Sequence, residues 1–419
     1  METYSYKQSQ ALFDRAVKVI PCGVPGHMSP AVNIPPSAYP IYAARSEGAK
    51  FWDVDGNEFI DYMCGYGPMI LGYGNPVVDE AARRQCEEAD LTMCASPKMV
   101  ELAEYLVDMV DSMSWAFFAK NGGDVTNYAA MVARSTTGRK KMVAIKGGYH
   151  GVAPWMQALG HHGIIEEDHT HTLRIPWNDV AAFEKVIAEN PGNVAGFIAT
   201  PYHVPTFYDN ELPDPGYWQK IEAICRKEGI VLILDDIRHG FRLNMKGSHV
   251  HYGFTPDLVC YCKALANGYP ISALMGTDAM KNEAAKVFYT GSYWYQAMPM
   301  AAALACLEEL KRLSAPEWML KQGGQLFGRM EEMAAGYGFN LKVTGEASMP
   351  NVRLTDDPSG MLHQAWCAEC TKRGAFFASH HNWFISMAHD DEVVARTLDI
   401  CDESFQVIKE ATEQGRLAS

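Results

Sequence analysis

The feature that most constrains the fold is a regular alternation between residues 115 and 276. Short apolar runs are separated there by stretches whose apolar positions recur every three to four residues. Such alternation of strands and helices predicts a mostly parallel sheet covered by helices on both faces. The predicted strands are residues 115–118, 141–145, 194–199, 230–234, 258–262 and 272–275, and the predicted helices are 125–136, 180–189 and 217–227.

The segments on either side do not join this alternation. Residues 50–54 and 58–62 alternate around a Val-Asp-Gly-Asn turn and predict a hairpin. A long helix follows Met298, and short strands with two helices then run to the end. With 419 residues, more than one domain is expected. We expect an N-terminal segment at 1–70 that packs with a small domain at 306–419, and a large domain at 71–305.

Composition bears on partners and location. A formal net charge of -14 argues against nucleic-acid and anionic-membrane partners. No apolar run is long enough to predict a membrane span, and the N-terminus predicts a short amphipathic helix ending near Pro21, not a signal peptide. The eleven cysteines favour a reducing compartment, so a cytoplasmic location is expected. Cys367 and Cys370 have redox or metal spacing, but without a second pair they predict core thiols, and no metal is expected.

Two adjacent carboxylates follow one of the predicted strands. Asp235 and Asp236 come directly after the apolar run 230–234. In open α/β sheets, ligands bind at the carboxyl ends of the strands, and successive side chains of a strand point to opposite faces. One carboxylate is therefore expected to meet a ligand while the other serves the structure. The alternative is that one caps the next element and the other is solvated.

A lysine occupies the same kind of position after the next apolar run. Lys263 follows residues 258–262 and precedes a turn of small residues. A lysine held among apolar side chains loses proton affinity, which suits its amine to nucleophilic attack. The plainer alternative is a strand-end lysine whose stem is buried and whose ammonium reaches solvent.

Two glycine-containing turns complete the set of strand ends. Gly122 and Gly123 lie between a predicted strand and helix, where unpaired N–H groups and the helix dipole favour a phosphate. Tyr149 and His150 lie between glycines after another strand, and an aromatic ring there can stack on a flat ligand. Either turn alone is common. Together with Lys263 and the acidic pair, they supply what pyridoxal phosphate needs at one edge of a sheet.

With these residues the chain resembles the class III aminotransferases, which are fold-type-I pyridoxal-phosphate enzymes, along nearly its whole length. The resemblance is carried by residues 235–242 (Asp-Asp-Ile-Arg-His-Gly-Phe-Arg), by the segment 256–268 around the lysine and by the Tyr-His-Gly at 149–151. It implies an α/β fold: a large domain with a mostly parallel seven-stranded sheet, and a smaller α+β domain.

The resemblance also implies roles for the matching residues. Lys263 would be the catalytic residue that carries the cofactor covalently. Asp235 would keep the pyridine nitrogen protonated, and Tyr149 and Ile237 would cover the two faces of the ring. The cofactor-binding residues that the resemblance implies are Gly122, Gly123, Tyr149, His150, Asp235, Ile237, Lys263 and Ser292.

Several positions depart from the family pattern. The Asn-Gly-Gly at 121–123 replaces a turn with two hydroxyl groups, so backbone N–H groups would have to hold the phosphate. The Thr-Pro at 200–201 replaces a Glu-Pro pair, and Trp-Tyr-Gln-Ala at 294–297 replaces Ser-Gly-Asn-Pro. Ser292 keeps a hydroxyl where the family has a threonine that reaches the phosphate from a neighbouring subunit. This implies a homodimer with active sites shared across the interface.

Within the family, Ser29 argues against glutamate-1-semialdehyde aminomutase, because the aminomutases carry an arginine there for the substrate carboxylate. A Gly-His at 26–27 and the His-Asn at 381–382 are similar to fumonisin-type amine:pyruvate aminotransferases. That similarity implies transfer of an amino group from a bulky or hydrophobic primary amine to a keto acid such as pyruvate, by a ping-pong mechanism. The aminomutase, or a racemase or decarboxylase on the same fold, is the alternative.

The sequence constrains the substrate pocket less than it constrains the cofactor site. Tyr66 and Trp294 are the aromatic candidates to line it. Arg238 is the candidate for the carboxylate of the amino acceptor, since a guanidinium can bind a carboxylate with two hydrogen bonds. Arg242 is expected to have a structural role.

Overall fold

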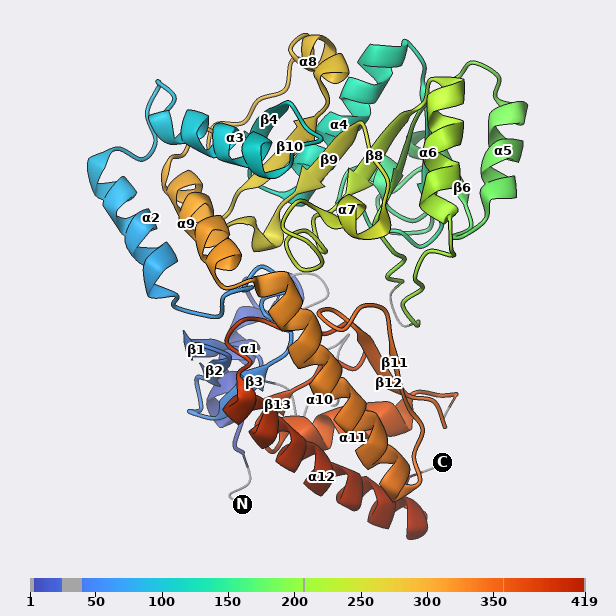
Figure 1. The fold of residues 1–419 in the computed structure, drawn as a ribbon. Coiled ribbons are helices and arrows are strands. Elements are labelled where there is room, and N and C mark those ends of the chain that lie inside the picture. The colour runs from blue at the N-terminus through green and yellow to red at the C-terminus, as the bar shows by residue number, and fades with distance from the viewer. Residues whose placement is uncertain (1–3, 25–39, 206–207, 357, 418–419) are drawn as a thin grey trace. The chain divides into compact units, whose positions relative to one another are not determined.

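The computed structural model describes residues 4–24, 40–205, 208–356 and 358–417. The chain divides into two compact units. The large unit comprises residues 76–205 and 210–317, and the small unit comprises residues 1–75, 206–209 and 318–419 (Figure 1).

The large unit is built on a seven-stranded sheet in the order β4-β10-β9-β8-β7-β5-β6. β10 runs antiparallel to both of its neighbours, and the remaining pairs of the β9-β8-β7-β5-β6 run are parallel. The carboxyl ends of β4, β5, β6, β7, β8 and β9 therefore meet at one edge. The strands are β4 (Trp115–Ala119), β5 (Lys141–Ile145), β6 (Thr172–Ile175), β7 (Val194–Ala199), β8 (Val231–Asp235), β9 (Leu258–Tyr261) and β10 (Ser272–Gly276).

The mostly parallel seven-stranded sheet confirms the predicted fold class. β6 is the strand that the apolar pattern did not reveal. It lies at the edge of the sheet, pairs only with β5, and three of its four residues are half-buried. An edge strand of this kind needs no continuous apolar run, so its sequence, Thr-Leu-Arg-Ile, carries little signal.

Helices flank this sheet. α4 packs across β4, β10, β9, β8 and β7, while α6 packs on β8 and α5 on β6 (Figure 1). α2 and α3 pack against α9. The helices of the large unit are α2 (Pro76–Glu88), α3 (Pro97–Met109), α4 (Gly122–Thr137), α5 (Val180–Glu189), α6 (Tyr217–Glu228), α7 (Ser248–Tyr252), α8 (Asp278–Ala284) and α9 (Met298–Arg312), with short 3-10 turns η3 (Pro154–Met156), η4 (Glu166–His169) and η5 (Lys263–Ala266).

The small unit joins both ends of the chain in one sheet of order β1-β2-β3-β13. β2 and β3 form the predicted hairpin, and β13 pairs with β3 in parallel. α1 ends at Ala16, five residues before Pro21. The elements of the small unit are α1 (Lys7–Ala16), β1 (Ala43–Glu47), β2 (Lys50–Asp53), β3 (Glu58–Asp61), α10 (Ala315–Tyr337), β11 (Leu341–Thr344), β12 (Asn351–Leu354), α11 (Met361–Thr371), β13 (Ala375–Phe376) and α12 (Asp391–Glu413).

The prediction of two helices after α9 was wrong, since the described residues contain α10, α11 and α12. α10 contains Gly323, Gly324 and Gly328, and glycine disfavours helix by about 1 kcal/mol per residue relative to alanine. At Gly323 the glycine has a packing reason, because a Cβ there would meet the carbonyl oxygen of Ala347. Tertiary packing therefore overrides the weak helical propensity of this segment.

α11 carries Cys367 and Cys370. Both thiols are buried and neither forms a disulfide, as expected for core cysteines. In the part of the chain that the structure describes, no helix has both the length and the hydropathy required to cross a membrane.

Candidate active site

A cavity of about 550 Å³ opens where the parallel strands of the large unit end. It is lined by residues that follow β4, β5, β7, β8 and β9, which is the edge at which open α/β sheets bind ligands. The cavity brings together residues that lie more than 140 positions apart in sequence. The predicted site residues that line it are Gly122, Gly123, Tyr149, His150, Asp235, Ile237, Arg238 and Lys263.

Lys263 lies in the turn that follows β9. It begins η5 with a φ of 36°, a left-handed conformation that is unusual for a residue with a side chain. Burial lowers the pKa of its amine to about 8, and the charge of Arg238 adds to this effect. The negative charge of Asp235 opposes the shift only in part. The amine therefore has a substantial uncharged fraction near neutral pH, which a nucleophile needs.

Asp235 and Asp236 lie in two different environments. Asp235 faces the cavity, where its Oδ2 atom lies 2.7 Å from Nδ1 of His150 and both side chains are nearly buried. Asp236 accepts hydrogen bonds from the backbone N–H and the hydroxyl of Ser248, at 2.9 and 2.6 Å. Burial raises the pKa of Asp236 to about 7. One carboxylate is thus available to a ligand, and the other ties β8 to α7.

The turn before α4 is shaped by two close approaches. A Cβ on Gly122 would lie 2.6 Å from Cδ1 of Ile237, and a Cβ on Gly151 would lie 2.7 Å from Cα of Gly123. At Gly151 the contact is with backbone and the φ angle is positive, so only glycine fits there, whereas a side chain at Gly122 would require Ile237 to shift. The first N–H groups of a helix have no partner within the helix, so this turn presents backbone donors and the positive end of the helix dipole.

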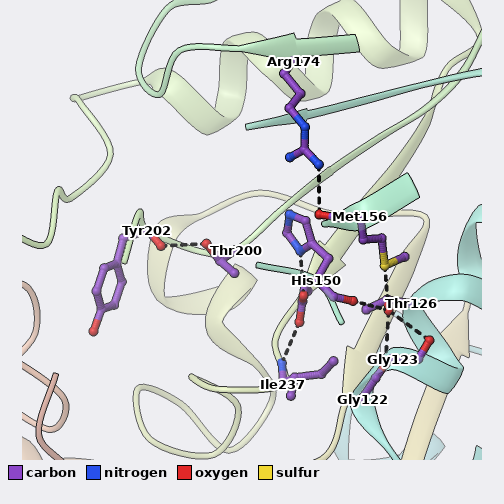
Figure 2. Close-up of polar contacts among 10 residues, drawn as sticks. Gly122, Gly123, Thr126, His150, Met156, Arg174, Thr200, Tyr202 and Ile237 are labelled. Carbon is purple, nitrogen blue, oxygen red and sulfur yellow. Dashed lines mark hydrogen bonds and ion pairs between the residues drawn. The ribbon is translucent and has the colours of Figure 1, made fainter. Parts of the chain in front are cut away.

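Thr126 fastens this turn to the loop after β5. Its hydroxyl donates to the carbonyl oxygen of His150 at 2.6 Å and also lies near the carbonyl oxygens of Gly122 and Gly123 (Figure 2). Thr126 is buried in the first turn of α4. Thr126 therefore holds the Gly122–Gly123 turn against the loop that contains His150.

These residues fit pyridoxal phosphate. The cavity volume falls in the usual range for small-ligand sites. Among the described residues, Nε2 of His150 and both ring nitrogens of His239 are buried without a hydrogen-bond partner, and such groups are normally satisfied by a ligand or water. An amine, a carboxylate and a glycine turn at a helix N-terminus stand around the same space.

Several residues of the cavity were missed by the sequence analysis. His203 lines it, and burial together with nearby His150 lowers the pKa of its imidazole to about 4. Burial also holds the pKa of His239 well below its usual value. Tyr289 closes another side, where its hydroxyl accepts from Asn127 at 3.2 Å. His239 lies within the 235–242 motif but was given no role there, whereas His203 and Tyr289 belong to none of the motifs. Only its strand-end position could have pointed to His203.

Three predicted site residues, Ser292, Trp294 and Tyr66, do not line this cavity. Ser292 is exposed elsewhere on the large unit, and Trp294 lines an apolar groove of about 370 Å³, where its ring packs edge-on against Phe117. Tyr66 lies in the small unit. Ser29, together with the Gly-His at 26–27, lies outside the described residues.

Tyr66 lines a cavity of about 380 Å³ that also includes Phe51 and Asp61. Its ring packs edge-on against His381, with centroids 5.1 Å apart. Residues 64–67 all have positive φ angles, which is unfavourable for Cys64 and for Tyr66 itself. The backbone thus holds the Tyr66 ring in this cavity at a conformational cost.

Comparisons with known proteins identify the family of this chain. The family model described as aminotransferase class-III matches residues 33–408. The aminopentol aminotransferase of Sphingopyxis macrogoltabida is 38% identical over 397 residues, which cover 95% of this chain and 93% of that protein. A glutamate-1-semialdehyde 2,1-aminomutase of Methanothrix thermoacetophila is 31% identical, with 95% of this chain and 96% of that protein covered.

Among solved structures, the FumI protein of Sphingopyxis sp. MTA144, in its PLP internal aldimine form, is 37% identical. It has a TM-score of 0.94, with 97% of this chain and 98% of that chain covered. The match spans the sheet, the cavity and the small unit alike. The chain therefore belongs to the class III aminotransferases, a family of fold-type-I pyridoxal-phosphate enzymes, as its strand-end motifs predicted.

Proposed function

We propose that this aminotransferase moves the amino group of a bulky or hydrophobic primary amine to a keto acid such as pyruvate, by a ping-pong mechanism. The observation that carries the proposal is that a half-buried Lys263 with a lowered pKa lines the same cavity as Asp235. The identity of 38% to an aminopentol aminotransferase supports an amine as the donor.

Pyridoxal phosphate, when bound, supplies an electron sink that stabilises negative charge on the carbon next to the transferred nitrogen. Lys263 would hold the cofactor through its amine and, once released, would move the proton of that carbon. Asp235, oriented by His150, would keep the ring nitrogen protonated. The N–H groups of Gly122 and Gly123 would hold the phosphate, and Ile237 and Tyr149 would cover the faces of the ring.

Arg238 lines the cavity and is our candidate for the acceptor carboxylate. Tyr66 and Trp294 are proposed to contact the carbon skeleton of the amine. Ser292 is exposed, which suits a hydroxyl that reaches the phosphate site of a second copy in a homodimer. We further propose a cytoplasmic enzyme in which an N-terminal segment at 1–70 packs with a small domain at 306–419, and a large domain at 71–305 binds the cofactor.

A donor panel tests the proposed reaction. Purified enzyme is incubated with aliphatic, aromatic and hydroxylated primary amines, with pyruvate or 2-oxoglutarate as acceptor, and the ketone or aldehyde and the new amino acid are quantified. We expect alanine to form in step with the carbonyl product. Carbon dioxide or an inverted amino acid without an acceptor would instead support a decarboxylase or racemase, and isomerisation of glutamate-1-semialdehyde would support the aminomutase.

Lys263→Ala should lower turnover by several orders of magnitude and should remove the visible absorption band that borohydride also removes. Lys146→Ala is the matched control, because Lys146 follows the parallel strand β5 but is exposed outside the cavity. A Lys263→Ala variant with ordinary activity would refute the assignment.

A further inference from the structure

Arg238 and Lys263 lie in the turns that follow two neighbouring strands. β8 and β9 are parallel, and Asp235 is the register partner of Cys260. Arg238 and Lys263 each follow their partner by three residues, beyond the ends of the two strands. Both residues line the same cavity. The two turns thus contribute a guanidinium and an amine to the lining of one cavity.

The charges that face Lys263 come mainly from the turn after β8. Arg238 and Arg242 are positive and Asp235 is negative. His239, on the same turn, stays neutral because burial and the neighbouring cations hold its pKa well below the usual value. The thiol of the preceding residue, Cys262, opposes the effect of the arginines, and Asp235 is hydrogen-bonded to His150 from the loop after β5.

The two arginines differ in access. Arg242 is completely buried and does not line the cavity, whereas Arg238 is partly exposed to it. Burial also lowers the pKa of Arg238, and the charge of Asp235 opposes this shift. Arg238 is therefore the positive charge next to Lys263 that an incoming anion can reach.

We propose that Arg238 is a positioning residue that couples acceptor binding to the protonation of Lys263. Without an anion, its guanidinium keeps the neighbouring amine uncharged and nucleophilic. When a carboxylate binds Arg238, the positive charge is offset and Lys263 takes up a proton more readily. By reciprocity, the carboxylate binds more tightly when Lys263 is protonated. The inference rests on the proposed function, in which Lys263 carries the cofactor and Arg238 meets the acceptor.

The test measures the titration of Lys263 directly. Full-length protein freed of its cofactor is pulse-labelled with acetic anhydride between pH 6 and 10, and acetylation of Lys263 is quantified by mass spectrometry. Wild-type protein should titrate near pH 8. Propionate, which has the acceptor's carboxylate but no reactive ketone, should move this midpoint upward. Since one pKa unit changes the uncharged fraction about tenfold at pH 7, labelling there should slow several-fold.

Substitutions assign the effect to Arg238. Arg238→Gln should titrate at higher pH than wild type and should not respond to propionate, whereas Arg238→Lys should retain both properties. Arg226→Gln is the matched control, because it removes one positive charge from the exposed face of α6 in the same unit. It should titrate like wild type.

Two results would overturn the coupling: an unchanged midpoint in Arg238→Gln, or an equal propionate shift in wild type and Arg238→Gln. If Arg238→Gln fails to fold, the absence of a propionate shift in wild type is sufficient to refute it. These outcomes are independent of the donor panel. If the enzyme transaminates amines but propionate does not shift the titration midpoint of Lys263, only the coupling is refuted. If propionate shifts the midpoint but no amine is transaminated, only the proposed reaction is refuted.

Discussion

At the scale of single residues, the cavity depends on a buried pair of polar side chains, His150 and Asp235. His150 lies in the loop after β5 and Asp235 ends β8, and their side chains meet at 2.7 Å. An unpaired buried polar group costs about 1–3 kcal/mol, so each partner fixes the other. The pair therefore orients the carboxylate before any ligand arrives.

The His150–Asp235 pair gives a first prediction. His150→Phe keeps a ring but leaves Asp235 without this donor, so the free energy of unfolding should fall by about 1–3 kcal/mol. Affinity for pyridoxal phosphate should fall at least tenfold. Urea unfolding and absorbance titration measure the two effects. His161→Phe, at an exposed position, is the control, and equal behaviour of the two variants would contradict the role of His150.

Asp236 gives a prediction about pH. Because the pKa of Asp236 is raised from 3.8 to about 7, the folded protein keeps a proton that the unfolded chain releases above pH 4. Its contribution to the free energy of unfolding therefore decreases as pH rises from about 4 to 7, and is constant above that range.

Asp236→Asn removes this titration. Relative to wild type, the variant should gain about 2–4 kcal/mol between pH 4 and pH 8, measured by urea unfolding at unit pH intervals. Asparagine keeps one acceptor for Ser248, so the fold should be retained. A constant difference between the two proteins across this range would show that Asp236 is ionised in the folded state throughout.

At the scale of elements, the sequence predicted those parts that repeat a physical pattern. The central strands are continuous apolar runs because they are buried on both faces, and Lys263 and Asp235 could be found because they end such runs. β6 was not predicted, and two helices were predicted where α10, α11 and α12 lie. Their signals are weak, since an edge strand needs no apolar run and a glycine in a helix is explained only by a distant loop such as the one at Ala347.

The same reasoning explains why the sequence did not assign His203 and His239 to the cavity. His203 and His239 contribute to the cavity only through the approach of one turn to another, as their contacts with Trp177 and Tyr202 illustrate. Such contacts leave no periodic trace in the sequence.

The glycines of α10 give a prediction for this element. Gly323→Ala should destabilise the protein by about 1–3 kcal/mol, because its Cβ would meet the Ala347 carbonyl and the loop must shift. Gly324→Ala should instead be neutral or stabilising by up to about 1 kcal/mol, since nothing lies within 4 Å of its Cβ position. Thermal and urea unfolding compare the pair. Equal stability of the two variants would contradict a packing role for Gly323 in α10.

At the scale of the whole molecule, the large unit exposes several large apolar side chains to solvent. Met93, Phe288 and Tyr293 are largely exposed. The two segments that carry them are joined, because Gln296 donates to Asp90 at 2.8 Å and the N–H of Ala297 donates to the Asp90 carbonyl. This face also carries the apolar groove around Trp294. A second copy of the chain is our proposed cover for it.

Phe288→Asp should therefore weaken self-association. Wild-type protein should elute with twice the mass of 46.5 kDa in size-exclusion chromatography with light scattering, and the variant should shift toward the monomer. Activity should fall together with the dimer, because Ser292 is proposed to act in the site of the other copy. Val250→Asp, on α7, is the control for a charge at an exposed apolar position. A monomeric wild type with full activity would contradict the shared site.

The left-handed turn at residues 64–67 has a consequence for engineering. A glycine at 64 or 66 would relieve about 1–2 kcal/mol of backbone cost, but it would also remove packing that offsets this gain. Cys64→Gly loses a buried thiol that contacts the carbonyl oxygens of Asp61 and Phe384, and Tyr66→Gly loses the aromatic ring from the cavity of the small unit. Selection for heat resistance should therefore leave both positions unchanged.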